Sequence, residues 1–236
     1  MSRGGAEHFT EPTTSYWQRI EPALPADLLR PPFQFGYPAL LPDGRYLVLP
    51  IRRREQKDRA VASFIANHAS FEVLDALADY MAAQAAAKRP DLVIGLPTLG
   101  LALAPLVARR LGHASFVPFG TSRKFWYDER LSQPLRSLTT TQAGRNLYVD
   151  PNLVPRLAGA RALIVDDTIS TGATALAAIE LAQSAGAEVV GLGFAMSQGD
   201  TWRQALAARG PCWPDAVSFV FQTPHFAQVE GGWTPL

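Results

Sequence analysis

Disulfide bonds are absent from this chain, because its 236 residues include a single cysteine, Cys212. A protein without disulfides is typical of a reducing compartment, and we expect a cytoplasmic location. Cys212 lies between prolines in the sequence PCWP, with no basic residue beside it. We therefore expect an unreactive thiol at this position.

An excess of charge of one sign is also missing. The chain has 22 Lys and Arg residues and 21 Asp and Glu residues, which gives a net charge of +1. No global field attracts nucleic acid or an anionic membrane surface, and no basic stripe is visible. We expect neither nucleic acid nor a membrane as a partner.

Long hydrophobic runs are broken or absent. The first thirty residues contain scattered charges and prolines in place of the apolar core of a secretory signal. The stretch 92–108 is uncharged, but Pro97 and Gly100 divide it into a short strand and a helix. With 47% apolar residues, the length favours one α/β domain with additions.

From residue 92 onward, the hydrophobic pattern alternates between strands and helices. Strands are expected at 92–96, 115–119, 147–149, 162–165, 188–196 and 216–221, and helices at 100–111 and 173–185. This alternation predicts a parallel sheet with right-handed crossovers, flanked by helices. Ligands of such sheets bind at the carboxyl ends of the strands.

The segments before residue 92 have a different character. Residues 1–32 predict an N-terminal arm, with Tyr16 and Trp17 either as anchors onto a neighbour or covered within the same chain, and 33–236 a single domain. A β-hairpin is expected over 33–51 and a helix from Val61 to about Lys88. Between them, the charged cluster 52–59 is either a solvated loop, a dimer edge or a patch that faces phosphate.

The sequence ALIVDDTISTGAT, residues 162–174, carries the clearest chemical signal. A buried strand ends in Asp166 and Asp167, a loop of small hydroxylated residues follows, and a helical pattern then begins. Two carboxylates can accept hydrogen bonds from vicinal sugar hydroxyls. Free backbone N–H groups and the helix dipole favour an anion such as phosphate at the helix start.

This segment resembles the phosphoribosyl-pyrophosphate (PRPP) signature of type I phosphoribosyltransferases. The resemblance implies that Asp166 and Asp167 are catalytic and hold the ribose of PRPP. It also implies a PRPP-binding loop made of Thr168, Ile169, Ser170, Thr171, Gly172, Ala173 and Thr174. Ala173 stands where many members have a second glycine, so the chain must adopt an ordinary helical conformation there.

The turn Leu96–Gly100 resembles the pyrophosphate loop of the same family. That loop offers backbone N–H groups to the departing diphosphate, often through an unusual peptide conformation. The resemblance implies that Thr98, Leu99 and Gly100 bind the diphosphate of PRPP. The alternative is a strand-to-helix turn without a ligand. The loop lacks the Arg or Lys that several members carry.

The segment 120–146 is longer than the usual connection between two elements of a compact domain, which indicates a functional loop. Its place in the sequence matches the flexible catalytic loop of the family. Arg123 and Lys124 resemble the basic pair of adenine-type members, which implies a catalytic role on the developing diphosphate charge. The alternative is an exposed surface pair. The Glu-Tyr-Gly segment of adenine-type members is not found here, which leaves the identity of the base open.

In this family a small hood over the strand ends recognises the base. Here we expect the hood from 33–51, from about 211–236, or from both. Phe226 and Trp233 are candidate base-binding residues, with simple anchoring of the tail as the alternative. His225 either touches a base or is a solvated loop residue.

The resemblance implies transfer of the phosphoribosyl group of PRPP to a nucleobase, with release of diphosphate. Adenine is the favoured acceptor, and orotate or xanthine is the alternative. A PRPP- or nucleotide-sensing regulator with little turnover is an alternative of another class. Mg²⁺ is the expected cofactor, bound through PRPP and water without a direct protein ligand. Exposed aromatic groups and the family's habit predict a homodimer.

Overall fold

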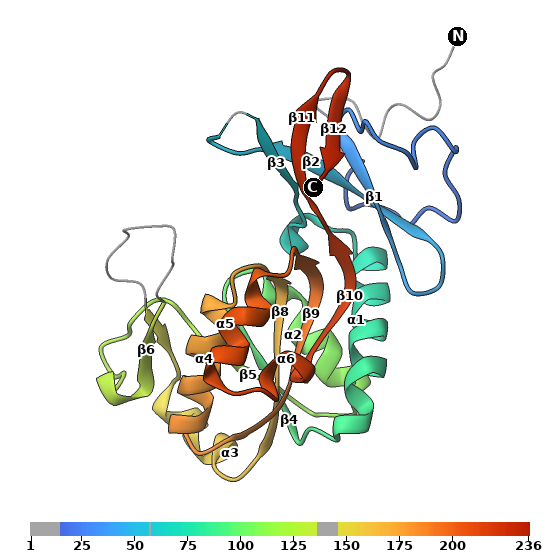
Figure 1. Ribbon diagram of the computed structural model, residues 1–236. Coiled ribbons are helices and arrows are strands. Elements are labelled where there is room, and N and C mark those ends of the chain that lie inside the picture. The colour runs from blue at the N-terminus through green and yellow to red at the C-terminus, as the bar shows by residue number, and fades with distance from the viewer. Residues whose placement is uncertain (1–14, 57, 136–145) are drawn as a thin grey trace.

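Two five-stranded sheets are the frame of the molecule, a core sheet below and a hood sheet above it in Figure 1. This computed structural model describes residues 15–56, 58–135 and 146–236. Within that part of the chain, no helix combines the length and the apolar character needed to cross a membrane.

The core sheet is parallel and has the strand order β10-β9-β8-β4-β5. Its strands are β4 (Leu92–Gly95), β5 (Val117–Pro118), β8 (Arg161–Ile169), β9 (Glu188–Gln198) and β10 (Val217–Thr223). The predicted fold class, a parallel sheet flanked by helices, is confirmed. The strands lie close to their predicted positions, although β5 is only two residues long.

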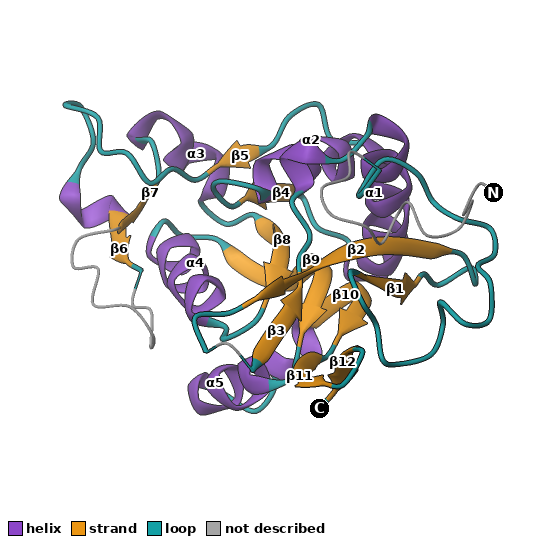
Figure 2. Ribbon diagram, turned by 90° about the horizontal axis from the view of Figure 1, so that it is seen from above, coloured by secondary structure: helices purple, strands orange, loops and turns teal. Residues whose placement is uncertain are grey.

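Helices cover both faces of the core sheet, which is why its strands are apolar on both sides (Figure 2). On β8, Leu163 and Val165 belong to the cluster that α1 (Phe71–Ala85) and α2 (Gly100–Arg110) cover. Ala162 and Ile164 belong to the opposite cluster, with α4 (Ala173–Ser184) and α5 (Thr201–Arg209). The sheet is thus fixed from both sides.

The hood sheet is antiparallel and joins two distant parts of the chain. Its order is β1 (Gly36–Leu40), β2 (Tyr46–Arg53), β3 (Arg59–Ala62), β11 (His225–Val229) and β12 (Gly232–Pro235). The hairpin predicted over 33–51 is confirmed as β1 and β2. Both predicted hood segments contribute, but residues 217–223 of the second belong to the core sheet as β10.

Residues 15–32 pack against the hood of their own chain. Tyr16 and Trp17 are buried, and the Trp17 Nε1–H donates to the carbonyl of Ser63 at 3.0 Å. Of the two alternatives for these rings, anchoring onto a neighbour or cover within the same chain, the structure shows the second. Residues 1–14 of the predicted arm lie outside the described residues.

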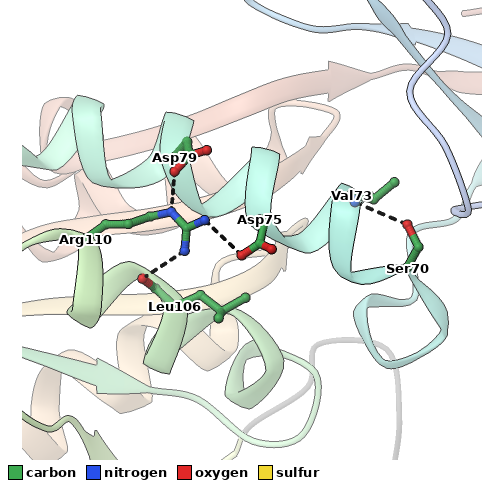
Figure 3. A network of polar contacts seen from close by, with 6 residues as sticks. All are labelled: Ser70, Val73, Asp75, Asp79, Leu106 and Arg110. Atoms are coloured by element: carbon green, nitrogen blue, oxygen red, sulfur yellow. Dashed lines mark hydrogen bonds and ion pairs between the residues drawn. The ribbon is translucent and has the colours of Figure 1, made fainter.

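The helix predicted over 61–88 begins later than expected. Residues 61 and 62 end strand β3, and α1 starts only at Phe71, where Ser70 Oγ accepts a hydrogen bond from the Val73 N–H at 3.2 Å (Figure 3). The apolar spacing of Phe64 and Ile65 imitates a helix. Instead, Phe64 packs on Phe221 of β10 with ring centroids 6.2 Å apart, at the junction of hood and core.

An arginine ties α1 to α2 beneath the hood (Figure 3). The guanidinium of Arg110 donates to Asp75 at 2.9 Å and also pairs with Asp79. A weaker hydrogen bond runs from Arg110 to the carbonyl of Leu106 at 3.4 Å. These contacts hold together the two helices that cover one face of the sheet.

The described part of the predicted flexible loop 120–146 contains short elements of secondary structure. A 3₁₀ turn at 129–131 leads into β6 (Ser132–Pro134), which pairs with β7 (Asn146–Tyr148). Residues 136–145 lie outside the described residues, so the expected lid is described only in part. The remaining short helices are α3 (Val154–Leu157) and α6 (Trp213–Ala216).

Candidate active site

The acidic pair lies within strand β8, where the sequence predicted the strand to have ended. Asp166 pairs in register with Phe194 of β9, and the ladder continues to Ile169 opposite Ser197. Strand β9 supplies these partners, so the strand extends four residues beyond its predicted end at Val165. The flexible part of the predicted PRPP loop is correspondingly short, Ser170 to Gly172.

Asp166 is almost completely buried, with 7% of its surface exposed. Its Oδ1 accepts a hydrogen bond from the Asp167 N–H at 2.9 Å, and the backbone N–H of Gly100 also bonds to this carboxyl. Burial raises the pKa of Asp166 well above its usual range, and the charge of Asp167 raises this pKa further. The two amide hydrogen bonds lower the pKa but do not outweigh burial.

Asp167 is half-buried beside its neighbour. Burial raises its pKa, while hydrogen bonds from Asp166 and Thr168 lower it. Thr168 Oγ1 lies 3.2 Å from Asp167 Oδ2, so the hydroxyl donates to this carboxylate. Asp166 and Asp167 therefore titrate as a coupled pair.

A small hollow of about 130 Å³ is lined by the residues of the predicted PRPP-binding loop together with Asp166. Gly172 has a φ of +82°, a conformation that favours glycine, and it directly precedes α4. No side chain caps this helix at Gly172, and the first turn holds no acidic residue. Its amide N–H groups are free to bind an anion.

Ala173 is the first residue of α4, as its Cβ required. The Ala173 N–H is 3.4 Å from Thr171 Oγ1, a weak hydrogen bond that a bound anion can replace. Trp202 of α5 closes the loop from behind, because a Cβ on Gly172 would lie 3.4 Å from its Cα. Sequence reasoning missed both α5 and this buried tryptophan.

The 97–100 loop meets the acidic pair through Gly100. A Cβ built on Gly100 would lie 2.6 Å from Asp166 Oδ1 and 2.7 Å from Asp166 Cα. Only glycine allows this approach, which brings the start of α2 against the carboxyl end of β8. The Pro97–Thr98 peptide is cis, which is an unusual peptide conformation. Thr98 and Leu99 precede Gly100 in this loop between β4 and α2.

The predicted basic pair lies on an exposed turn. Arg123 forms an ion pair with Glu129 at 2.7 Å within the same segment, with 57% of its side chain exposed. Lys124 is exposed as well, and its carbonyl accepts a hydrogen bond from the Tyr127 N–H. Phe125 is 96% exposed and Trp126 49% exposed. None of the described contacts brings Arg123 or Lys124 to the acidic pair.

The two candidate base-binding aromatics are packed inside the hood. Phe226 has no exposed surface and packs on Tyr37 and Phe33, with ring centroids 5.3 and 6.3 Å apart. Trp233 is 8% exposed, and the guanidinium of Arg53 lies over its ring at 5.5 Å. Both rings anchor the tail, so the structure offers neither as a stacking surface for a base.

A second and larger hollow, of about 700 Å³, lies between the hood and the carboxyl ends of β9 and β10. Arg54, Arg59, Thr223 and His225 are among its lining residues. The sequence did not predict this hollow, because it left the 52–59 cluster open between a solvated loop, a dimer edge and a patch that faces phosphate. Residues far apart in the chain meet here only through the pairing of β3 with β11.

The acidic pair carries the oxygen ligands that the expected Mg²⁺ prefers. Among residues 15–56, 58–135 and 146–236, no three His, Cys, Asp or Glu side chains gather into a metal cage. The two adjacent carboxylates are hard oxygen ligands of the kind that Mg²⁺ prefers. Asp166 and Asp167 fit a Mg²⁺ that arrives on the oxygens of a bound substrate and keeps part of its water shell.

Comparison with known proteins gives a consistent result. A family model described as the phosphoribosyl transferase domain matches residues 61–226. The adenine phosphoribosyltransferase of Sorangium cellulosum strain So ce56 is 33% identical over 153 residues, which cover 64% of this chain and 71% of that protein. The adenine phosphoribosyltransferase of Solibacter usitatus is 39% identical over 105 residues, 44% of this chain and 56% of its own length.

Structural comparison supports the same fold. The crystal structure of APRTase from Giardia lamblia complexed with 9-deazaadenine has a TM-score of 0.58 and 22% sequence identity. The similarity covers 74% of this chain and 93% of that one. At this identity, the likeness shows the fold alone.

A methyl group at Gly100 should destabilise the folded protein at the candidate site. We expect Gly100→Ala to lower the free energy of unfolding by about 1–3 kcal/mol, the usual cost of overpacking, because the new Cβ would clash with Asp166. Urea unfolding measures this loss. Gly120→Ala is the matched control, since a Cβ there meets nothing within 4 Å. Equal midpoints for both variants would contradict the close approach.

Asp166 should reduce the stability of the ligand-free protein at neutral pH. A carboxyl whose pKa is raised on folding lowers the free energy of unfolding once it ionises. This destabilisation disappears as the pH falls through the folded-state pKa and the carboxyl becomes protonated. Asp166→Asn should therefore be more stable than wild type at about pH 8, by on the order of 1 kcal/mol. The difference should shrink on acidification, as thermal unfolding at several pH values would show. A difference independent of pH would contradict the raised pKa.

Proposed function

This chain belongs to the phosphoribosyl transferase domain family, and we propose that it transfers the phosphoribosyl group of PRPP to a purine base, releasing diphosphate. The chain spans 71% of the Sorangium relative but 56% of the Solibacter relative. Support for the reaction and its substrates therefore has to come from the site of this chain as well.

The observation that carries the proposal is the acidic pair beside an uncapped helix start. Asp166 and Asp167 present two carboxyls at the carboxyl end of β8, and α4 begins six residues beyond Asp167. Ribose hydroxyls fit the carboxyls, and a 5′-phosphate fits the amides after Gly172. A sugar phosphate satisfies both halves of this arrangement at once.

Diphosphate would leave C1 of the ribose as a ring nitrogen of the base approaches. The transition state has oxocarbenium character, so the task of the chain is to position the substrates and to stabilise charge. Asp166 and Asp167 hold the ribose hydroxyls and face the developing positive charge. When bound, Mg²⁺ would neutralise charge on the diphosphate.

The diphosphate is assigned to Thr98, Leu99 and Gly100, because Gly100 brings the end of this loop against Asp166. This loop carries no cation, so its backbone and residues elsewhere must supply the binding energy. We assign Arg123 and Lys124 to the diphosphate as well, in a closed form of their segment. The ion pair of Arg123 with Glu129 is exposed, and breaking it costs little, about 0–1 kcal/mol.

Adenine is the expected acceptor, because the relatives that are 33% and 39% identical are named as adenine phosphoribosyltransferases. The single cysteine supports a cytoplasmic location for this reaction. A sensor of PRPP with little turnover would keep the same site, and only kinetics separates it from an enzyme.

Turnover tests the proposal directly. With PRPP and Mg²⁺, the protein should release diphosphate on addition of adenine and form the matching nucleotide. Asp167→Asn should lower kcat/KM by about ten- to a hundredfold, because a charged hydrogen bond contributes about 1.5–3 kcal/mol. Asp215→Asn removes the same charge at a position outside the site and is the control. PRPP binding without release of diphosphate for any base would support a sensor instead.

We also propose a homodimer. Phe125 is 96% exposed and Trp126 49% exposed, and Phe71 at the start of α1 is 85% exposed, so the chain presents large apolar groups to solvent. Light scattering at micromolar concentration should give about twice the mass of 25.6 kDa. Phe71→Ser and Phe125→Ser, measured separately, would show which segment is buried between subunits. A mass of one chain for wild type would overturn the proposal.

A further inference from the structure

Helix α5 packs directly against the segment 170–172 and the first turn of α4, named here together the phosphate loop. A Cβ added to Gly172 would lie 3.4 Å from both Cα and Cβ of Trp202, and 3.5 Å from Cβ of Ala205. Figure 1 shows α4 and α5 side by side. The first residues of α5 therefore form a wall of the phosphate loop and limit where its backbone can lie.

A buried hydrogen bond fixes the start of α5 to the core sheet. Trp202 and Ser197 have no exposed surface, and the Trp202 Nε1–H donates to Ser197 Oγ at 2.9 Å. The Ser197 hydroxyl in turn donates to the carbonyl of Gly199 at 3.2 Å, in the turn that leads from β9 to α5. The indole N–H and the serine hydroxyl thus both have partners in a buried environment, where a hydrogen bond is stronger than in water.

Ser197 lies in the sheet at the level where the phosphate loop begins. It pairs in register with Ile169, the last residue of β8, and the loop starts at the next residue. Ser197 is therefore linked to the loop in two ways, through the strand ladder to Ile169 and through Trp202 to Gly172. A backbone that is held at both ends keeps its amides in place before an anion binds.

The indole ring of Trp202 is held by further contacts. Its centroid lies 6.4 Å from that of the Phe219 ring on β10, and the guanidinium of Arg203 lies over it at 4.4 Å. Arg203 also pairs with Asp200 at 3.3 Å, just before α5. Rotation of the ring would disturb this packing, since close-packed interiors leave little free space. The ring thus transmits the position of the core sheet to Gly172.

We propose that Trp202, held by Ser197, is a positioning residue for the 5′-phosphate of PRPP. Trp202 acts through the backbone of Gly172, which has a φ of +82° and directly precedes the amides of α4. A loop that is ordered in advance loses less conformational entropy when the phosphate binds. The inference rests on the proposed function, because it adds a residue to the phosphate half of the same site.

Trp202→Phe tests this role, because it removes the indole N–H and keeps an aromatic ring in the core. We expect the KM for PRPP to rise by about three- to tenfold, the effect of one lost hydrogen bond, with kcat and the KM for adenine unchanged. A purely structural role would lower the amount of folded protein and leave both KM values as they are. Trp213→Phe, in α6 and outside the phosphate loop, is the matched control and should change neither KM.

A double-mutant cycle separates the hydrogen bond from the loss of packing. Ser197→Ala removes the acceptor and should raise the KM for PRPP by a similar factor. In the double variant the second change should add almost nothing, because the bond is already lost. If the two factors instead multiply, the residues act independently and the proposal is overturned. Should Trp202→Phe fail to fold, Ser197→Ala carries the comparison with Trp213→Phe.

Binding of ribose 5-phosphate, measured by calorimetry, decides the case without turnover. Wild type and Trp213→Phe should bind it with equal affinity, and Trp202→Phe more weakly by about the factor found for PRPP. Equal affinity in all three proteins, or no binding by wild type, would overturn the inference.

Failure of the inference and failure of the proposed function are distinguishable. Turnover of adenine with the same KM for PRPP in wild type and Trp202→Phe would overturn the positioning role and leave the transfer reaction intact. If no base is turned over but Trp202→Phe binds ribose 5-phosphate more weakly than wild type, the transfer reaction is wrong and the positioning role stands.

Discussion

The contact between Gly100 and Asp166 is the constraint on which the whole site depends. The backbone at the start of α2 comes so close to β8 that no side chain fits between them. Through this contact the Asp166 carboxyl joins the 97–100 loop to β8, and the loop 170–172 follows directly along the chain. The three parts of the proposed sugar-diphosphate site are thus held relative to one another by packed backbone.

The same contact explains why the acidic pair is costly in the absence of a ligand. Asp166 is buried between α2 and β9 and lies beside a second carboxyl, so both effects favour its protonated form. A substrate with hydroxyl donors and an attached cation reverses both effects, because it supplies hydrogen bonds and positive charge. The free protein therefore keeps a destabilising group in the place where binding energy is needed.

The strand–loop–helix of the PRPP motif, the parallel sheet and the 33–51 hairpin could be predicted from the sequence, because each rests on local pattern. The pattern misplaced the end of β8, because the partner that extends this strand, β9, lies in a distant segment. It also left Phe226 open between base binding and anchoring of the tail, and only the structure shows the ring packed in the hood against Phe33 and Tyr37. Long-range pairing decides such cases, and a single sequence carries no direct signal for it.

The hollow between the hood and the core sheet shows the same limit. Arg54 and Arg59 flank the turn between β2 and β3, and read alone they are an ordinary solvated turn. They line this hollow together with His225 only because β11 returns from the far end of the core sheet and pairs with β3, which brings His225 opposite Val61. Since β11 follows β10 after one residue, only Pro224 separates Thr223 of the core sheet from His225 of the hood. The lining of this hollow is therefore set by how two distant chain segments meet.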